Sequence, residues 1–245
     1  YTGEDTLSLH DALPISRNNM ILFAGDPHGS YEHLYPFVQE NDNVALIILG
    51  DLQLSSPDEL DKLAQHCDIW FIHGNHDSKT VAAFEAIWGT HWKSRNLHNR
   101  VVEIQGQRIA GLGGVFRGQI WMPPNKPMYF DPIHYCQYSP QEKIWRGGVP
   151  LRHRTSIFPS DIEAIENEQA DILICHEAPK PHPMGFRVIN QLAEKLGVRH
   201  VFHGHHHDNV EYKTNFPYKI TNVGFRSVTD VQGNYLLKTI DDREK

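Results

Sequence analysis

Five apolar segments of the sequence each end in a short cluster of side chains that can bind metal ions. The clusters are Asp26-Pro27-His28, Gly50-Asp51, Gly74-Asn75-His76-Asp77, His176 and Gly204-His205-His206-His207. Their donors are carboxylate and amide oxygens and imidazole nitrogens, which suit manganese, iron, zinc or cobalt rather than calcium or a thiolate-bound metal. Because the donors outnumber the ligands of one tetrahedral ion, the sequence predicts two metal ions.

The spacing inside two clusters predicts which side chains act together. Asp26 and His28 are two residues apart, so in an extended chain both side chains point to the same side. His205 and His207 have the same spacing, and His206 is expected to point away as a packing or surface histidine. Glycines at positions 25, 50, 74 and 204 permit sharp turns and close approach of the backbone.

The segments that carry these clusters have the pattern of buried strands separated by helices. The predicted strands are residues 20–24, 44–49, 69–72, 172–175 and 198–202, and the predicted helices are residues 30–40, 56–66, 79–88, 160–169 and 186–196. Strands that are apolar on both faces and alternate with helices indicate a largely parallel sheet. Ligands of such sheets bind beyond the carboxyl ends of the strands, so we expect one sheet to gather all five clusters at one edge.

The middle and the end of the chain depart from this alternation. Residues 101–104 and 108–112 are predicted to form a hairpin, and residues 209–240 two or three antiparallel strands. The positions expected to be buried in this last part are Tyr212, Tyr218, Ile220 and Leu236. The fold class predicted for the chain is mixed α/β (α+β), in one domain over residues 20–245 that contains two sheets.

Residues 115–158 show no clear periodicity and are rich in aromatic residues and proline. Long segments of this kind are functional or disordered, and the aromatic content argues against disorder. The segment is either a cap that selects the substrate or an excursion that covers a sheet edge. Arg117, near its start, is a candidate substrate contact, and a plain surface arginine is an equally good interpretation.

The first residues of the chain are interpreted separately. Residues 6–15 resemble the translation of a sequencing adapter, so residues 1–19 are expected to be a non-native or disordered leader that ends before Met20. The same 245 residues carry a formal net charge of −7, which argues against duplex DNA or an anionic membrane as a partner. Three cysteines without metal-site spacing favour free thiols and a cytoplasmic location.

The ordered motifs DxH, GD, GNHD, H and GHxH resemble those of the calcineurin-like metallophosphoesterase superfamily, and the resemblance extends from Met20 to the end of the chain. It implies a two-sheet β-sandwich flanked by helices and two divalent metal ions, with manganese expected and iron, zinc or cobalt as alternatives. The implied ligands are Asp26, His28 and His207 for one ion, Asn75, His176 and His205 for the other, and Asp51 as the bridge between them.

The resemblance also implies an activity, which is hydrolysis of a phosphomonoester or phosphodiester in a small phosphorylated substrate. A hydroxide that bridges the two ions would attack phosphorus, and His76, poised by Asp77, would give a proton to the leaving oxygen. Residues 52–54 are Leu-Gln-Leu, whereas protein Ser/Thr phosphatases and diadenosine tetraphosphate hydrolases have Asp-Arg-Gly after the motif Gly-Asp, so neither of these two branches is favoured.

Two other functions remain open at this point. A nuclease acting on single-stranded nucleic acid would need a path for the strand, which only the basic and aromatic residues of 115–158 could supply. A non-catalytic protein that keeps the metal site as a binding scaffold is the second alternative. Scaffold relatives often lose the catalytic histidine, so the presence of His76 favours an enzyme.

Overall fold

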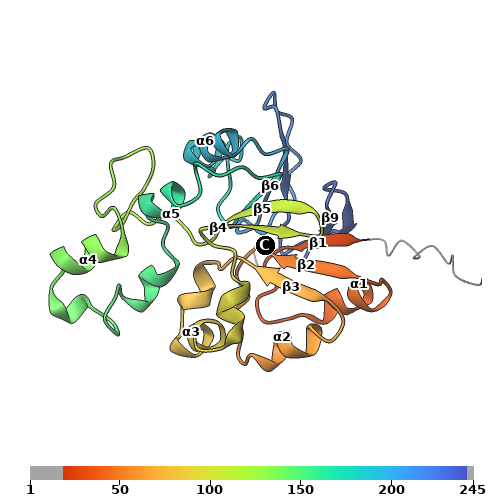
Figure 1. Cartoon of the computed structure of the whole chain (residues 1–245), viewed down its shortest axis with the longest axis horizontal. Helices are drawn as coiled ribbons and strands as arrows, with labels where there is room; N and C mark the ends of the chain where they lie inside the picture. Colours follow the sequence, from red (N-terminus) through yellow and green to blue (C-terminus); the bar gives the residue numbers. More distant parts are fainter. Residues whose placement is uncertain (1–18, 242–245) are drawn as a thin grey trace, which may run out of the picture.

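The computed structural model describes residues 19–241, so residues 1–18 of the predicted leader lie outside the described residues. Two five-stranded sheets pack face to face and are flanked by helices (Figure 1), which confirms the predicted two-sheet α/β fold. The strands of the first sheet, in the order β10-β9-β1-β2-β3, are Tyr235–Leu237, Val228–Asp230, Met20–Ala24, Val44–Ile48 and Asp68–Phe71. Those of the second, in the order β4-β5-β6-β7-β8, are Arg100–Ile104, Gln107–Leu112, Ile172–Cys175, His200–His203 and Lys219–Asn222.

The strand directions confirm the parallel core and the hairpin but correct the prediction for the C-terminal part. β1 to β3 are parallel, β5 to β8 are parallel, and β4 and β5 form the expected hairpin. β8 was expected in an antiparallel arrangement but lies parallel to β7, and within this part of the chain only β9 and β10 form an antiparallel pair of strands. Tyr218 and Ile220 are buried as expected. Tyr212 is only half-buried, and Leu236 is 46% exposed because β10 is an edge strand.

Strands that are apolar on both faces supply two separate layers of core. In β1, Phe23 points between the sheets, where its ring stacks on Phe202 of β7 with the ring centroids 3.9 Å apart. The neighbouring Leu22 faces the opposite way and packs with Leu34 and Leu60 in the layer between the first sheet and its helices. This alternation explains why β1 and β2 lack polar residues until the point where they end.

The helices are shorter than predicted. They are α1 (Tyr35–Gln39), α2 (Asp58–Leu63), α3 (Val81–Trp88), α4 (Pro132–Tyr138), α5 (Pro159–Glu163) and α6 (Arg187–Leu196). The helix expected over residues 30–40 is split into a 3-10 turn, Glu32–Leu34, and α1, which has Pro36 in its first turn, where a missing N–H removes no helical bond. α6 ends at Gly197, which adopts a left-handed conformation with φ 67°. Between residues 19 and 241, no helix is long and apolar enough to cross a membrane.

Residues 115–158, called the insert below, fold into a small unit that projects from the sandwich (Figure 1, green). The insert contains α4 and two 3-10 turns, and it has an apolar cluster of its own. The residues of that cluster are Ile120, Tyr135, Val149 and Phe158. Its last turn, Leu151–Thr155, lies beside the turn Asn75–Ser78, with the Ser78 and Thr155 hydroxyls 2.7 Å apart. The insert therefore borders one of the polar clusters.

The stack between the sheets gives a test of this packing. We expect Phe202→Ala to lower the free energy of unfolding by about 3–5 kcal/mol, because the cavity forms where both sheets meet. The exposed Leu236→Ala is the control, with an expected change of at most about 0.5 kcal/mol. Urea unfolding followed by circular dichroism measures both values. Equal effects of the two substitutions would contradict the packing described here.

Candidate metal centre

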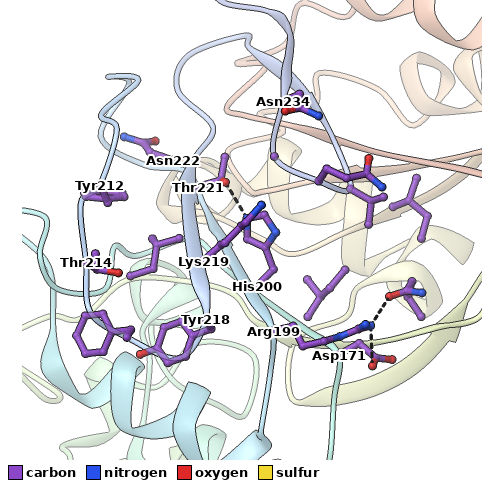
Figure 2. Close-up of a pocket in the computed structure, with 18 of the residues that line it drawn as sticks. Asp171, Arg199, His200, Tyr212, Thr214, Tyr218, Lys219, Thr221, Asn222 and Asn234 are labelled. Carbon is purple, nitrogen blue, oxygen red and sulfur yellow. Dashed lines mark hydrogen bonds and ion pairs between the residues drawn. The ribbon is translucent and has the colours of Figure 1, made fainter.

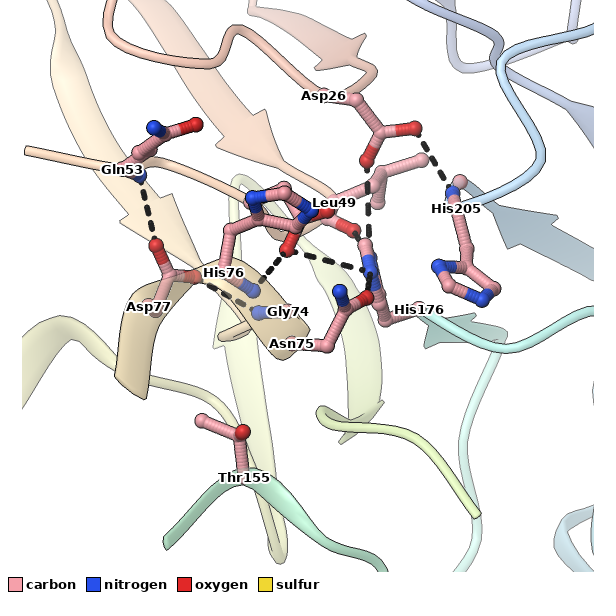
Figure 3. A network of polar contacts seen from close by, with 12 residues as sticks. Asp26, Leu49, Gln53, Gly74, Asn75, His76, Asp77, Thr155, His176 and His205 are labelled. Carbon is pink, nitrogen blue, oxygen red and sulfur yellow. Dashed lines mark hydrogen bonds and ion pairs between the residues drawn. The ribbon is translucent and has the colours of Figure 1, made fainter. Parts of the chain in front are cut away.

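The five polar clusters meet at one end of the sandwich, but they come from two sheets and not from one as predicted. Asp26, Asp51 and Asn75 follow β1, β2 and β3 of the first sheet, and His176 and His205 follow β6 and β7 of the second. The carboxyl ends of both sets of parallel strands lie at the same end, so these side chains converge between the sheets (Figure 3). The prediction of one sheet was wrong because the sequence of a buried, apolar strand does not show which of two sheets the strand joins.

His176 lies at the centre of the cluster and is completely buried. Its Nδ1 lies 2.7 Å from the Leu49 carbonyl, which can only accept, so Nδ1 carries the proton. Its Nε2 lies 3.5 Å from Asp51 Oδ1 and 3.3 Å from Asn75 Oδ1. A backbone carbonyl that fixes the tautomer in this way is the usual partner of a metal-binding histidine.

The two histidines predicted to share an ion with Asp26 lie on the other side of Asp51. His28 Nε2 is 2.9 Å from His207 Nε2 and 3.7 Å from Asp51 Oδ2. The remaining nitrogens have partners of their own, since His28 Nδ1 contacts Gln53 Oε1 at 2.9 Å and His207 Nδ1 contacts Asp241 Oδ2 at 2.7 Å. Sequence reasoning missed Gln53 and Asp241, and Asp241 belongs to no motif that could have identified it.

The backbone that presents these side chains is strained. Asp26, His28, Asp51, His205 and His207 all have positive φ, with values of 35°, 46°, 50°, 74° and 57°. The pairs Asp26/His28 and His205/His207 therefore lie in left-handed turns, and the extended conformation expected for them is wrong. Left-handed backbone costs a non-glycine residue about 1–3 kcal/mol and is found where function requires it.

Two glycines allow the strand ends to approach one another. A Cβ at Gly50 would lie 2.3 Å from His176 Nδ1, and one at Gly74 would lie 2.2 Å from Asp51 Oδ1. Such distances are impossible for a side chain, so the predicted close approach of the backbone at these glycines is confirmed. Backbone amides then orient the carboxylates, because His205 N donates to Asp26 Oδ2 and His76 N donates to Asp51 Oδ1, both at 2.8 Å.

The sequence suggested that Asp77 orients the imidazole of His76, but in the structure the Asp77 carboxylate contacts backbone amides instead. Its two carboxylate oxygens accept from Gln53 N at 2.7 Å and Gly74 N at 2.8 Å (Figure 3). His76 Nδ1 is buried and has no hydrogen-bond partner within the described residues 19–241. The reason is local, since a carboxylate at this position of a turn reaches back to the amide three residues earlier. Asp77 thus holds the Asn75–Ser78 turn in place beside Asp51.

Arg117 is half-buried and tied to the end of the insert. Its guanidinium donates to the Thr155 carbonyl at 2.8 Å and to Ser156 Oγ at 3.0 Å. Burial and the nearby Arg152 lower the pKa of Arg117 to about 10, whereas the charges of Glu177 and Asp51 raise it. Its electrostatic environment therefore includes the polar centre, and whether it contacts a substrate stays a prediction.

The charges at the centre fit a divalent cation. Burial raises the pKa of Asp26 to about 8, and among residues 19–241 its buried Oδ1 accepts no hydrogen bond. Although burial alone would lower the pKa of His176, the carboxylates of Asp51 and Asp26 raise it to about 10. Protons on Asp26 and His176 thus offset the negative charge of this buried site near neutral pH, a task that a bound cation can also perform.

Two groups of side chains have donor atoms close enough to hold one ion each. Donor atoms of His28, Asp51 and His76 lie within 4.8 Å of one another, and so do those of Asp51, His176 and His205. Asp51 is common to both groups and is 1% exposed. Its position between them is where a ligand shared by two ions has to lie.

A large cleft of about 1270 Å³ lies elsewhere on the molecule (Figure 2). It is lined by residues at the amino ends of the strands, among them Asp171, Arg199, His200 and Lys219. Arg199 pairs with Asp171 at 3.0 Å, and His200 contacts Thr221 Oγ1 at 2.8 Å, so these polar groups satisfy one another. None of the residues predicted to bind metal or substrate lines this cleft, and ligands of parallel sheets bind at the opposite end.

Comparison with known proteins gives a family and a relative for this chain. A family model described as calcineurin-like phosphoesterase matches residues 20–209. The chain is 81% identical over 226 residues to an uncharacterized protein of Haemophilus influenzae, and the alignment covers 92% of this chain and 100% of the relative.

Solved structures show the same fold at low sequence identity. TT1561 of Thermus thermophilus superposes with a TM-score of 0.58 and 14% identity, covering 90% of this chain and 98% of that chain. The phosphopantetheinyl hydrolase of Mycobacterium tuberculosis superposes with a TM-score of 0.54 and 12% identity, covering 86% and 92% of the two chains. At such identities the likeness concerns the fold alone.

The balance of charge at the centre predicts opposite effects of pH on the chelated and the metal-loaded protein. The folded-state pKa values of His176 (about 10) and Asp26 (about 8) are both raised, so the stability that their protons provide is lost as the pH rises through these values. In EDTA, the melting temperature should therefore fall between pH 7 and pH 9. Buried histidines with lowered pKa are already neutral above pH 7 and add nothing in this window.

With excess Mn²⁺ the trend should reverse, because ligands that have lost their protons bind metal more tightly. Differential scanning fluorimetry at both pH values, with EDTA or Mn²⁺, measures the two slopes. A rise in melting temperature on adding Mn²⁺ that is the same at pH 7 and pH 9 would contradict a metal-binding role for these groups.

Proposed function

Because the chain belongs to the calcineurin-like phosphoesterase family, we propose that it hydrolyses a phosphomonoester or phosphodiester of a small substrate with two divalent ions at the strand ends described above. Family membership itself supports a metal-dependent phosphoesterase, which is a hydrolase. The observation that carries the dinuclear proposal is Asp51, a buried carboxylate common to two groups of metal-binding side chains.

The assignment of ligands follows the sequence motifs and the contacts in the structure. We assign Asp26, His28 and His207 to one ion, Asn75, His176 and His205 to the other, and Asp51 to both. The contacts of His28 with His207 and of His176 with Asn75 support this division. Hard oxygen and imidazole donors without thiolate support manganese, with iron, zinc or cobalt as alternatives.

The residues around the ions have separate tasks in the proposed reaction. The bound ions supply positive charge for the phosphate and make water acidic enough to act as a nucleophile near neutral pH. His76 gives a proton to the leaving oxygen. Its ring lies beside His28 with centroids 4.8 Å apart, and burial lowers its pKa, so its protonated form is a stronger acid than free imidazole. Asp77 is a positioning residue, because it holds the turn that carries His76.

The insert is proposed to select the substrate, and Arg117 to bind it. Arg117 joins the beginning of the insert to its end at Thr155 and Ser156, next to the turn that carries His76. A phosphate at the centre would therefore lie near a guanidinium that is already held in place, which is the arrangement that favours binding. The free cysteines Cys67, Cys136 and Cys175 support the proposed cytoplasmic location.

The nuclease alternative gains no support from the insert. Arg154 donates to the backbone carbonyls of Val149 and Trp145, and Arg146 pairs with Glu85. Arg154 thus holds the insert together and Arg146 joins it to α3, so neither arginine is left open for a nucleic-acid strand. The scaffold alternative is separated from the enzyme by an activity assay.

Substitutions of Asp51, His76 and Arg117 test the proposed function. The full-length protein with Mn²⁺ is assayed on p-nitrophenyl phosphate and on its bis ester. We expect Asp51→Asn to abolish detectable turnover, because one buried carboxylate serves both ions. His76→Ala should lower kcat about 10²–10⁴-fold through loss of the general acid. Arg117→Met should raise KM more than it lowers kcat.

The control is His91→Ala, since His91 is exposed and far from the strand ends, and it should leave kcat and KM unchanged. A preference of the wild type for the bis ester would assign the protein to phosphodiesters. If wild type, Asp51→Asn and His76→Ala hydrolyse both esters at the same rate, the protein is not an enzyme of this kind.

A further inference from the structure

A third group of metal-binding side chains lies beside the proposed dinuclear centre. Donor atoms of Glu177, His205 and His206 lie within 4.8 Å of one another. Glu177 follows the proposed ligand His176, and His206 follows the proposed ligand His205, so each residue lies one position beyond the first cluster. Neither Glu177 nor His206 has a part in the two-ion centre proposed above.

The cluster contains a buried carboxylate with one hydrogen bond and, among residues 19–241, a buried imidazole nitrogen without one. Glu177 is 4% exposed, and the hydrogen bond found for its carboxylate within residues 19–241 is from Phe116 N to Oε1 at 3.0 Å. The Nε2 atom of His206 is buried and has no hydrogen-bond partner among the same residues. A buried polar group without a partner costs about 1–3 kcal/mol, and a buried carboxylate costs more. Both costs disappear if a cation lies between the two groups.

The neighbouring histidines, His203 and His182, have polar partners for their Nε2 atoms. His203 Nε2 contacts the Tyr212 hydroxyl at 2.9 Å, and His182 Nε2 lies 3.3 Å from Asp208 Oδ2. His182 also stacks on His206, with ring centroids 4.0 Å apart and an interplanar angle of 21°. Stacking fixes the plane of the His206 ring without occupying its nitrogens, so the ring is held ready for another ligand.

Arg117 does not neutralise Glu177, although its charge influences that carboxylate. The guanidinium itself donates to Thr155 and Ser156. Within residues 19–241, the Glu177 carboxylate therefore forms no ion pair with a cationic side chain.

We propose that Glu177, His205 and His206 form a binding site for a third divalent cation. The site rests on the proposed function in sharing His205, whose two ring nitrogens face different ways, one toward His176 and the other away from it (Figure 3). A neutral imidazole offers one nitrogen to a cation, so His205 would bind both ions as an imidazolate, and its ring proton would be released to solvent. One carboxylate and two imidazoles are a donor set that zinc and manganese accept. The third ion adds positive charge on the Arg117 side of the centre, where a phosphorylated substrate is proposed to bind.

Counting bound ions tests this site without relying on activity. The full-length protein is stripped with a chelator and titrated with Mn²⁺, and electron paramagnetic resonance of the free aqueous ion gives the number bound. Manganese is used because the chain has 17 histidines, to which zinc would bind unspecifically. We expect three equivalents for the wild type and two for Glu177→Gln and for His206→Asn. The matched control Glu166→Gln, at a glutamate paired with Lys195, should keep three.

Each outcome of the Mn²⁺ titration either supports or overturns the third site. Thermal melts of the chelated proteins show which variants are folded, and either of the two variants is sufficient for the comparison. Two equivalents in the wild type overturn the third site and leave the dinuclear centre intact, whereas fewer than two overturn both. Three equivalents in both variants, or loss of more than one ion in the folded variants, also overturn the assignment to Glu177 and His206.

Discussion

The fold depends on holding two buried carboxylates and a buried imidazole between the ends of two sheets. Asp26, Asp51 and His176 are at most 1% exposed, and Oδ atoms of both carboxylates lie within 3.6 Å of the His176 ring. Charges in such a place are costly unless they are balanced by opposite charge and by hydrogen bonds. Backbone amides of His76 and His205 supply the hydrogen bonds, and a proton or a metal ion supplies the charge.

The remaining structure serves this arrangement at successive levels. Apolar strands form a layer between the sheets, represented by the stack of Phe23 on Phe202, and that layer fixes the distance between the two sets of strand ends. Gly50 and Gly74 then bring the loops into direct contact. Left-handed backbone at several of the proposed ligands turns their side chains toward the centre, and the surrounding packing has to offset the strain.

Much of this could be predicted from the sequence, because buried strands and their polar ends are local patterns. The strand Ile172–Cys175 and the cluster at Asp51 are examples, and five such clusters in one chain are enough to predict a metal site. The number of sheets that carry the clusters is not local information. The role of Asp77 depends on the geometry of one tight turn, and the contact of His207 with Asp241 joins distant parts of the chain. Spacing alone contains neither.

The central claim is that Asp51 links two metal ions from its place between the sheets, and an anomalous scattering map of crystals loaded with Mn²⁺ tests it most directly. Around Asp51, the predicted map has two peaks about 3.5–4 Å apart, with the Asp51 carboxylate between them. One of the two should lie beside His28 and the other beside His176. A single peak at these residues, or two peaks of which only one contacts Asp51, would contradict the account.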